Sequence, residues 1–196
     1  MKKLNYLLSL GVLLSLMVLA GCDDDAPEAE NEEEIITDVT LTFTPDGGGT
    51  AVVAAAKDAD GEGPGDLAVI SDITLDSGTT YTLTLDLQNS IEQESITEEI
   101  EEEDDEHMFF FEWTSGLFTN PTGDGNIGAG NRADPVNYED TDGTNPVGLE
   151  TSWTAGAAAT GTFRVILKHQ PDIKTASSNS TDGESDIDIT WNITIE

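Results

Sequence analysis

Apolar and polar residues alternate with a period of two along most of the chain. The alternation is clearest over 39–43, 81–87 and 187–195, where aliphatic and aromatic residues are separated mainly by Thr, Asp and Asn. Half-buried β-strands have this period, because successive side chains point to opposite faces of a sheet. Shorter runs over 50–57 and 67–75 predict further strands, with Gly-containing turns between the runs. We therefore predict an all-β fold, an immunoglobulin-like sandwich of about seven or eight antiparallel strands.

Two segments depart from this alternation. Over 95–106, Ser95 and Glu98 fit a helix capping box, and the early Glu residues suit the positive end of a helix dipole. The later acidic residues oppose that dipole, so we predict one or two helical turns that end in an acidic loop. Residues 114–148 are rich in Gly, Asn, Asp and Pro. They predict a loop longer than compact domains usually contain, and such loops are either functional or disordered.

The N-terminus has the features of a secretory signal. Two lysines precede an apolar run over 7–20, which is too short to remain as a membrane span. The sequence Leu-Ala-Gly-Cys over 19–22 closes the run and resembles the lipobox of bacterial lipoproteins. This resemblance implies cleavage before Cys22 and attachment of lipid to it, which would anchor the protein to the outer membrane. The alternative is a signal followed by an unrelated cysteine, although Cys22 is the single Cys of the chain.

We therefore divide the chain into a signal peptide (1–21), a lipidated Cys with a disordered acidic tether (22–34), and a β-sandwich domain (35–196). The tether contains almost no apolar residues, so ordering it would bury too little surface. Its first acidic run, over 23–25, resembles the signal that sends some lipoproteins to the cell surface. The alternative is a solvating spacer, which leaves the periplasmic face of the membrane equally open.

The charge balance is strongly acidic, with 40 Asp and Glu residues, 7 Lys and Arg residues and a formal net charge of −33. Nucleic acids and anionic lipid surfaces need cationic patches on their partners, so neither is expected to bind this protein. Metal cations and basic proteins remain as partners, together with an outer-membrane transporter that could receive a bound ion.

The two histidines give the most specific prediction. His107 shares a strand face with 109, 111 and 113, and His169 shares one with 163, 165 and 167. We consider the two strands as antiparallel neighbours, in a register that places His107 opposite His169 and Trp113 opposite Phe163. Opposed residues on one face have Cβ atoms roughly 5 Å apart. Both imidazoles would then converge at one rim of the sandwich.

An acidic segment directly precedes His107 and supplies further candidate ligands. Two imidazoles with one or two carboxylates match the ligand types of Zn²⁺ and similar divalent cations. The candidate ligands are His107, His169, Glu103, Asp105 and Glu106. The neighbouring carboxylates should also raise the pKa of His107. The alternative is a pair of strand-end histidines below an acidic loop that is simply solvated.

Two short motifs resemble fragments of calcium-binding loops. Asp58 and Asp60 form the first, Asp140 and Asp142 form the second, and each ends directly before a Gly. The EF-hand pattern needs a third oxygen ligand two positions earlier, which neither sequence supplies. Tight turns are therefore the preferred interpretation, and weak calcium binding between loops is the alternative.

The sequence offers little support for catalysis, since it contains no G-x-S-x-G and its one Cys is assigned to lipid. We predict a non-enzymatic binding or accessory module at the outer membrane, with a divalent metal as the candidate ligand. The alternatives are a structural or adhesive surface module without a small ligand, and a hydrolase that acts on surface polymers.

Four features together resemble a group of small acidic bacterial lipoproteins: the lipobox, the acidic tether, the acidic run 98–103 that leads into 107–111, and the late His169-Gln170-Pro171. Some members of that group are labelled type 1 periplasmic-binding-fold proteins. The label implies two α/β lobes with parallel sheets, which conflicts with the period-two pattern and with a chain of 196 residues. The pattern therefore predicts a β-sandwich in place of the labelled fold.

Overall fold

The computed structural model describes residues 34–58, 67–127 and 135–196. The predicted signal peptide, Cys22, the predicted tether up to residue 33, and Asp60 of the first calcium-like motif lie outside these residues. Within them, β-strands account for all regular structure except one short helix, which confirms the predicted all-β sandwich.

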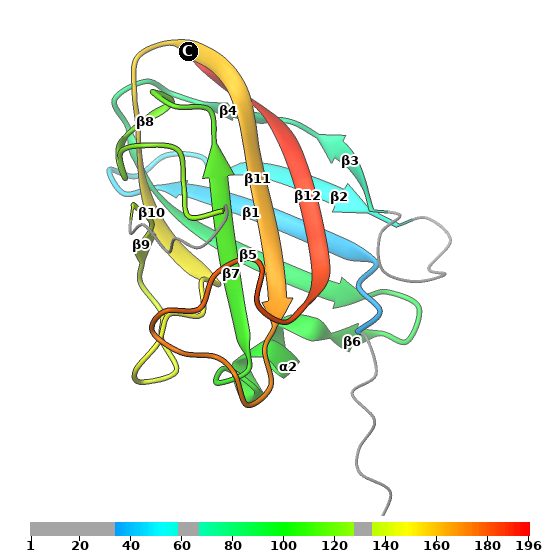
Figure 1. Cartoon of the computed structure of the whole chain (residues 1–196). Helices are drawn as coiled ribbons and strands as arrows, with labels where there is room; N and C mark the ends of the chain where they lie inside the picture. Colours follow the sequence, from blue (N-terminus) through cyan, green and yellow to red (C-terminus); the bar gives the residue numbers. More distant parts are fainter. Residues whose placement is uncertain (1–33, 59–66, 128–134) are drawn as a thin grey trace, which may run out of the picture. The chain divides into compact units, whose positions relative to one another are not determined.

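The larger sheet contains eight strands, and the strands predicted over 39–43 and 81–87 pair with each other near its centre. The other strands extend the sheet on both sides of this antiparallel pair (Figure 1). The eight strands are β1 (Asp38–Pro45), β2 (Val52–Lys57), β3 (Ala68–Ser71), β5 (Thr80–Asn89), β6 (Glu94–Ser95), β8 (Phe118–Asn120), β9 (Asn137–Tyr138) and β10 (Glu150–Ala155).

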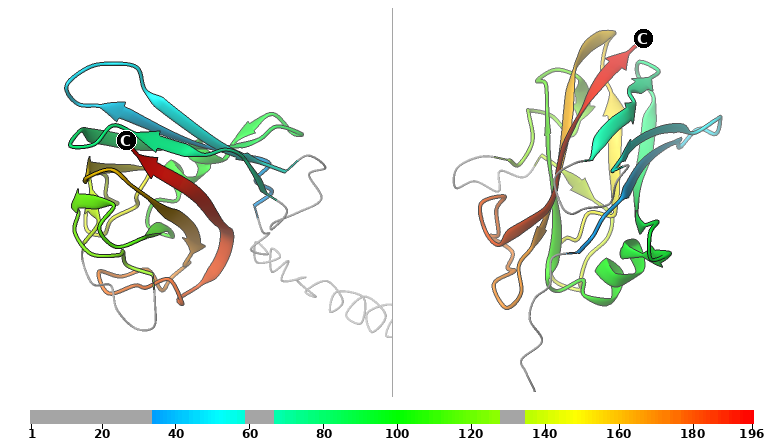
Figure 2. Two further views of the ribbon diagram at one scale, coloured as in Figure 1. Left: turned by 90° about the horizontal axis from the view of Figure 1, so that it is seen from above. Right: turned by 90° about the vertical axis from the view of Figure 1, so that its right-hand side faces the viewer.

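The smaller sheet contains four strands in the order β4-β12-β11-β7. Its strands are β4 (Ile73–Leu75), β7 (His107–Trp113), β11 (Ala159–His169) and β12 (Glu184–Ile195). β11 pairs antiparallel with both β12 and β7, whereas β4 pairs parallel with the end of β12. The two views of Figure 2 show β11 and β12, in orange and red, as a layer apart from the blue and cyan strands of the larger sheet.

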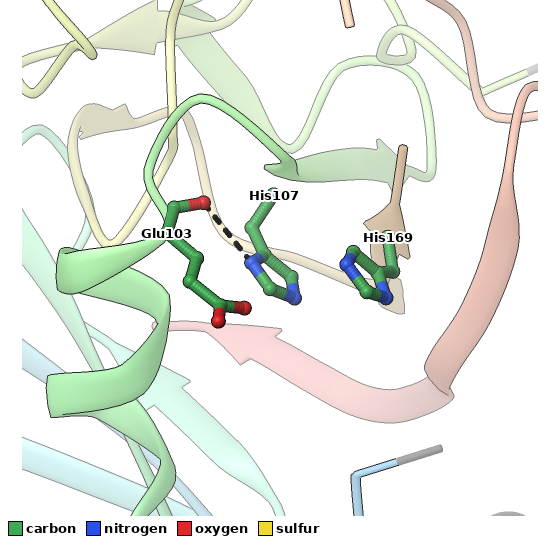
Figure 3. A group of neighbouring side chains, drawn as sticks. All are labelled: Glu103, His107 and His169. Atoms are coloured by element: carbon green, nitrogen blue, oxygen red, sulfur yellow. Dashed lines mark hydrogen bonds between the residues drawn. The ribbon is translucent and has the colours of Figure 1, made fainter. Parts of the chain in front are cut away.

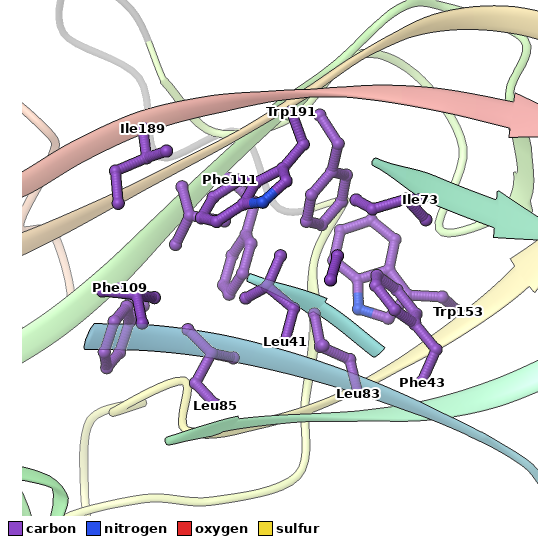
Figure 4. Packing of buried hydrophobic residues seen from close by; sticks show 14 of the residues in the cluster. Leu41, Phe43, Ile73, Leu83, Leu85, Phe109, Phe111, Trp153, Ile189 and Trp191 are labelled. Carbon is purple, nitrogen blue, oxygen red and sulfur yellow. The ribbon is translucent and has the colours of Figure 1, made fainter. Parts of the chain in front are cut away.

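The two sheets bury their apolar faces against each other. Alternate residues of β1 and β5 are buried, as the period of two requires. Phe43 of the larger sheet packs edge-on against Phe163 of the smaller one, with ring centroids 5.9 Å apart. Trp153 makes a similar edge contact with Phe111 (Figure 4) and another with Trp113. This aromatic cluster packs the ends of β7 and β11 that are remote from their histidines.

Each predicted strand run is present, but the run over 67–75 divides in two. β3 and β4 are separated by Asp72 and belong to different sheets, so the chain crosses between the layers there. The described residues form 12 strands, which is more than predicted. The excess comes from this crossing and from the short strands β6, β8 and β9, which are too brief to show a repeating pattern.

The predicted helix is α2 (Ile96–Glu102), and Ser95 is its N-cap. The Oγ of Ser95 accepts a hydrogen bond from the backbone N–H of Glu98 at 3.3 Å, as expected for a capping box. The helix buries Ile96 and Ile100 and ends in turns over 103–106. The predicted short helix with an acidic loop is thus confirmed, and it delivers that loop to the start of β7.

The segment predicted as a long loop, 114–148, is partly ordered by β8 and β9. Two of its residues, Ile127 and Tyr138, pack on a small cluster formed by Met108, Phe110 and Ile166 on the outer face of the smaller sheet. Met108 and Phe110 are fully buried as a result. Both faces of β7 are therefore covered.

Candidate metal centre

The predicted pairing of the two histidines is confirmed. β7 and β11 pair antiparallel with 107 opposite 169, 109 opposite 167 and 113 opposite 163. The imidazole rings of His107 and His169 are stacked, with centroids 4.4 Å apart and planes that differ by 7° (Figure 3). Strand pairing alone therefore brings both rings to one rim of the sandwich.

The acidic turn before β7 orients His107. The ring is fully buried, and its Nδ1 lies 3.2 Å from the backbone carbonyl oxygen of Glu103, the contact dashed in Figure 3. A carbonyl oxygen can only accept, so Nδ1 donates in this contact and Nε2 carries the lone pair of the neutral ring. Metal-binding histidines are commonly oriented by a second hydrogen bond of this kind.

Glu34 lies against the other nitrogen of His107, so its assignment to a disordered tether was wrong. Its Oε1 is 3.3 Å from Nε2 of His107, and its side chain is only 12% exposed. The separation permits an ion pair, but neither Nε2 nor Oε2 of Glu34 has a hydrogen-bond partner among the described residues. Ile36, two residues later, is buried in the core and fixes the start of the domain beside the rim.

The pKa of His107 is raised above its ordinary value. Burial alone would lower it, but the nearby Glu34 carboxylate, the Glu103 carbonyl and the charge of Asp186 favour the protonated ring and outweigh burial. The predicted direction is confirmed, although the carboxylate with the largest effect is Glu34 and does not belong to the acidic run.

The three acidic residues predicted as ligands differ in where they lie. The potential ligand atoms of Glu103, His107 and His169 all lie within 4.8 Å of one another. Glu106 has its Oε2 at 3.1 Å from Nε2 of His169. Asp105 is exposed and does not belong to the group of neighbouring ligand atoms found in the described chain. The structure therefore brings three of the five predicted metal ligands together, Glu103, His107 and His169. Glu106 contacts His169 but does not belong to that group, and Asp105 is left outside.

A β-bulge brings a further carboxylate to the rim. Residues 167 and 168 of β11 pair with 187 and 185 of β12, so Asp186 is the extra residue of β12. Bulges redirect side chains, and Asp186 is buried next to the buried Ile187. Burial, followed by the charge of Glu34, raises the pKa of Asp186 to about 6, while the charges of both histidines oppose the increase.

Gly183 allows β11 and β12 to approach each other closely at this rim. Its φ is +73°, and an added Cβ would lie 2.0 Å from the backbone carbonyl oxygen of His169. A side chain at 183 would therefore displace the start of β12, and with it the bulge that carries Asp186.

Three buried atoms of this cluster lack a hydrogen-bond partner within the described residues: Glu34 Oε2, His107 Nε2 and Asp186 Oδ2. Buried polar atoms are usually paired, because an unpaired one costs about 1–3 kcal/mol of desolvation free energy. A cation among these atoms would remove that cost. Imidazole nitrogen and carboxylate oxygen are ligands of zinc and related divalent ions.

The stacked rings limit how one ion could be held. The lone pairs of nearly parallel rings run side by side instead of meeting at one point, so one ring must turn before both can bind the same ion. His169 is the ring with more freedom, because it is 7% exposed and ends its strand, whereas His107 is completely buried.

In the second calcium-like motif, Asp142 stabilises a tight turn and pairs with a lysine side chain. One oxygen of Asp142 accepts hydrogen bonds from the backbone N–H groups of the two residues at 144 and 145, as expected for a tight turn. The other oxygen lies 3.3 Å from Nζ of Lys174, whose side chain has no exposed surface. Lys174 Nζ also donates to the backbone carbonyl of Asp104. We call Asp142, Lys174 and the Asp104 carbonyl the lysine cluster.

The remaining calcium-like residues lie elsewhere. Asp140 accepts hydrogen bonds from the backbone N–H groups at 148 and 149. Asp58 directly follows β2 and is buried. Asp58, Asp140 and Asp142 do not belong to the group of potential metal ligands found in the described residues.

Comparison with known proteins gives no family for this chain. No protein-family model matches it, and no curated protein or solved structure matches it either. Among the described residues, no helix has the length and apolar character needed to cross a membrane.

Two residues of the site, Glu34 and Asp186, escaped prediction from the sequence. The apolar pair Ile35-Ile36 directly after Glu34 signals where burial begins and could have included it. Asp186 carries no such signal, because the alternation of β12 places it with Asp188 on the outward face.

Proposed function

We propose that the mature protein is a lipid-anchored, non-enzymatic module at the outer membrane that binds a divalent metal ion through His107 and His169. The observation that carries this proposal is the group formed by Glu103, His107 and His169, whose potential ligand atoms lie within 4.8 Å of one another. The ligand types favour Zn²⁺ or another borderline divalent ion. The buried rings leave little room for a substrate beside the ion, which favours holding the ion over catalysis.

The membrane anchor rests on the lipobox-like sequence at 19–22 and belongs to the proposal. Cys22→Ser should release the protein from the membrane fraction of cells, because the lipid could no longer be attached. Protease treatment of intact cells would then separate a cell-surface location from the periplasmic face. A bound ion could pass from this position to an outer-membrane transporter or a basic protein.

Metal titration tests the binding function directly. The protein, with its own N-terminal segment and in detergent, is titrated with Zn²⁺ while heat release and thermal unfolding are followed. We expect binding that raises the unfolding temperature, and His107→Ala or His169→Ala should abolish it. Asp105→Asn is the matched control, since it removes one exposed negative charge from the same segment and should leave binding unchanged. Indifference of the unmodified protein to Zn²⁺, Mn²⁺ and Ni²⁺ would leave the structural or adhesive surface module as the better function.

A further inference from the structure

We infer that Glu34 and Asp186, and not the exposed acidic run, supply the negative ligands of the metal centre. This inference deepens the proposed metal-binding function and rests on it. It assigns two ligands from chain segments outside the acidic turn, one at the start of the domain and one in the bulge of β12. Neither residue belongs to the group formed by Glu103, His107 and His169. Because the two imidazole rings are stacked, one of them has to turn before these carboxylates and both histidines can bind one ion.

Asp186 is a carboxylate in a place where water cannot stabilise it. The residue is 6% exposed, and its Oδ2 has no hydrogen-bond partner in the described part of the chain. The bulge at 186 directs this side chain inward at the end of β12 that pairs with His169. The charges of His107, His169 and Lys168 act on this carboxylate, but its Oδ2 remains without a hydrogen bond from the described residues, which a cation bound next to it would compensate.

Glu34 likewise has a carboxylate oxygen that is buried without a hydrogen bond in the described chain. Its Oε1 faces Nε2 of His107 at 3.3 Å, while its Oε2 is buried and unpaired within the described residues. His107 Nε2 is itself fully buried and, although Glu34 Oε1 lies 3.3 Å away, has no hydrogen-bond partner among the described residues. Two carboxylates carry two negative charges, which one divalent cation would balance.

The acidic run differs from this pair in its exposure. Glu103 and Asp105 are exposed, and the side chain of Glu106 is 35% exposed. Water and salt screen the charges of such groups, so they contribute little to binding energy at short range. Glu103 acts chiefly through its backbone carbonyl, which holds the His107 ring in position.

The completed set of two imidazoles and two carboxylates defines the class of ion. It contains no thiolate or thioether, so it disfavours soft Cu⁺. Two nitrogen ligands disfavour Ca²⁺, which prefers oxygen from six or more groups. The set therefore matches borderline divalent ions, with Zn²⁺ as the probe.

The experiment measures Zn²⁺ affinity at pH 7.5 by competition with a chelator, using the protein in detergent and four variants: Glu34→Gln, Asp186→Asn, Glu103→Gln and Asp105→Asn. We expect each of the first two to weaken binding by about 10- to 100-fold, as loss of a supporting carboxylate does at zinc sites. Glu103→Gln should weaken it less, because its backbone carbonyl remains, and Asp105→Asn should leave it unchanged.

The outcomes separate this inference from the proposed function. Failure of the unmodified protein to bind Zn²⁺ would overturn both. Binding that survives intact in Glu34→Gln and Asp186→Asn, but is lost in Glu103→Gln, would overturn the inference and leave the metal-binding function standing. Denaturant unfolding of each metal-free variant verifies that it is folded. Glu34 lies before the first strand, so Glu34→Gln tests the assignment of buried carboxylate ligands without altering the bulge at Asp186.

Discussion

Two clusters of charged residues contact the acidic turn, the lysine cluster and a histidine cluster. The histidine cluster consists of Glu34, Glu106, His107, His169 and Asp186. The two clusters differ in how many of their buried polar atoms have a hydrogen-bond partner. In the lysine cluster, the carbonyl of Asp104 and a carboxylate oxygen of Asp142 both contact the ammonium of Lys174. In the histidine cluster, the carbonyl of the preceding residue, Glu103, binds His107 in a similar way. The lysine cluster has an ammonium in direct contact with its carboxylate, whereas in the histidine cluster three buried atoms lack a hydrogen-bond partner among the described residues. Lys168, whose charge acts on Asp186, donates its hydrogen bond to Ser185.

The comparison shows what the histidine cluster lacks. The neighbouring backbone carbonyls of Glu103 and Asp104 each contact one cluster. The ammonium of Lys174 supplies the positive charge of the lysine cluster. In the histidine cluster, the basic groups that contact Glu34 and Glu106 within the described residues are imidazoles, which can release a proton and accept a metal. We therefore interpret the lysine cluster as structural and the histidine cluster as a site for an exchangeable cation.

The largest expected effect comes from removing the fixed cation. Lys174→Met keeps most of the side-chain volume but leaves the Asp142 carboxylate, whose side chain is 5% exposed, without its cation, which should lower the free energy of unfolding by about 3 kcal/mol. Chemical denaturation measures this loss. Lys57→Met is the matched control: its ion pair with Asp38 is partly exposed, at 46% and 25%, so the loss should stay below about 1 kcal/mol. Equal losses in both variants would remove the distinction between the lysine cluster and a surface pair.

Zn²⁺ should act on the histidine cluster alone. At a free concentration of about 100 times the dissociation constant, it should add about 2.7 kcal/mol to the free energy of unfolding. The same increment is expected in Lys174→Met, since the ion does not replace the lost ammonium. Rescue of Lys174→Met beyond the increment seen in the unmodified protein would show that the two clusters are coupled.

Asp186→Asn should have opposite effects on stability and on binding. Without metal, it removes a buried carboxylate oxygen that has no partner within the described chain. We expect the metal-free free energy of unfolding to rise by about 1–2 kcal/mol, even as Zn²⁺ affinity falls. Denaturation in a chelating buffer measures the first effect, and a loss of metal-free stability would contradict the comparison.

Acid should weaken the lysine cluster through Asp142. Burial acts to raise the pKa of this carboxyl, but backbone N–H groups at 144 and 145, the Asn145 side chain and Lys174 together lower it below 3.8. A depressed pKa stabilises the folded state above the ordinary value and is lost as the pH falls through the depressed one. The difference in free energy of unfolding between the unmodified protein and Asp142→Asn should therefore shrink below pH 3.8. A constant difference from pH 6 to pH 2 would show that this ionisation contributes nothing.

The smallest effect is expected from Asp105→Asn. Asp105 is exposed and belongs to neither cluster, so its replacement should change the free energy of unfolding by less than about 0.5 kcal/mol. Its Zn²⁺ affinity should equal that of the unmodified protein at moderate salt. A marked loss of affinity would mean that the summed charge of the turn, and not the buried geometry, attracts the ion.

The sequence predicted the parts of the site that follow from local periodicity. The alternation in β7 and β11 predicts which residues face inward. The register that places His107 opposite His169 was an assumption, and the structure has that register. The capped helix was also predictable, because Ser95 and Glu98 act on neighbouring backbone groups.

The unpredicted parts depend on contacts between distant segments. The bulge at Asp186 adds one residue to a regular strand, and nothing in the alternation of β12 marks the place. Lys174 reaches Asp104 across 70 positions of the chain, so its partner could not be inferred from spacing. Glu34 was placed in the tether on composition, although burial of Ile36 holds it against His107.

Under the proposed lipid anchor, the position of Glu34 sets an upper limit on the distance between the histidine rim and the membrane. Cys22 and Glu34 are joined by the 12 residues from Asp23 to Glu34, and an extended chain spans at most about 3.6 Å per residue. If Cys22 carries the lipid, a captured ion stays within roughly 43 Å of the bilayer surface by this chain length.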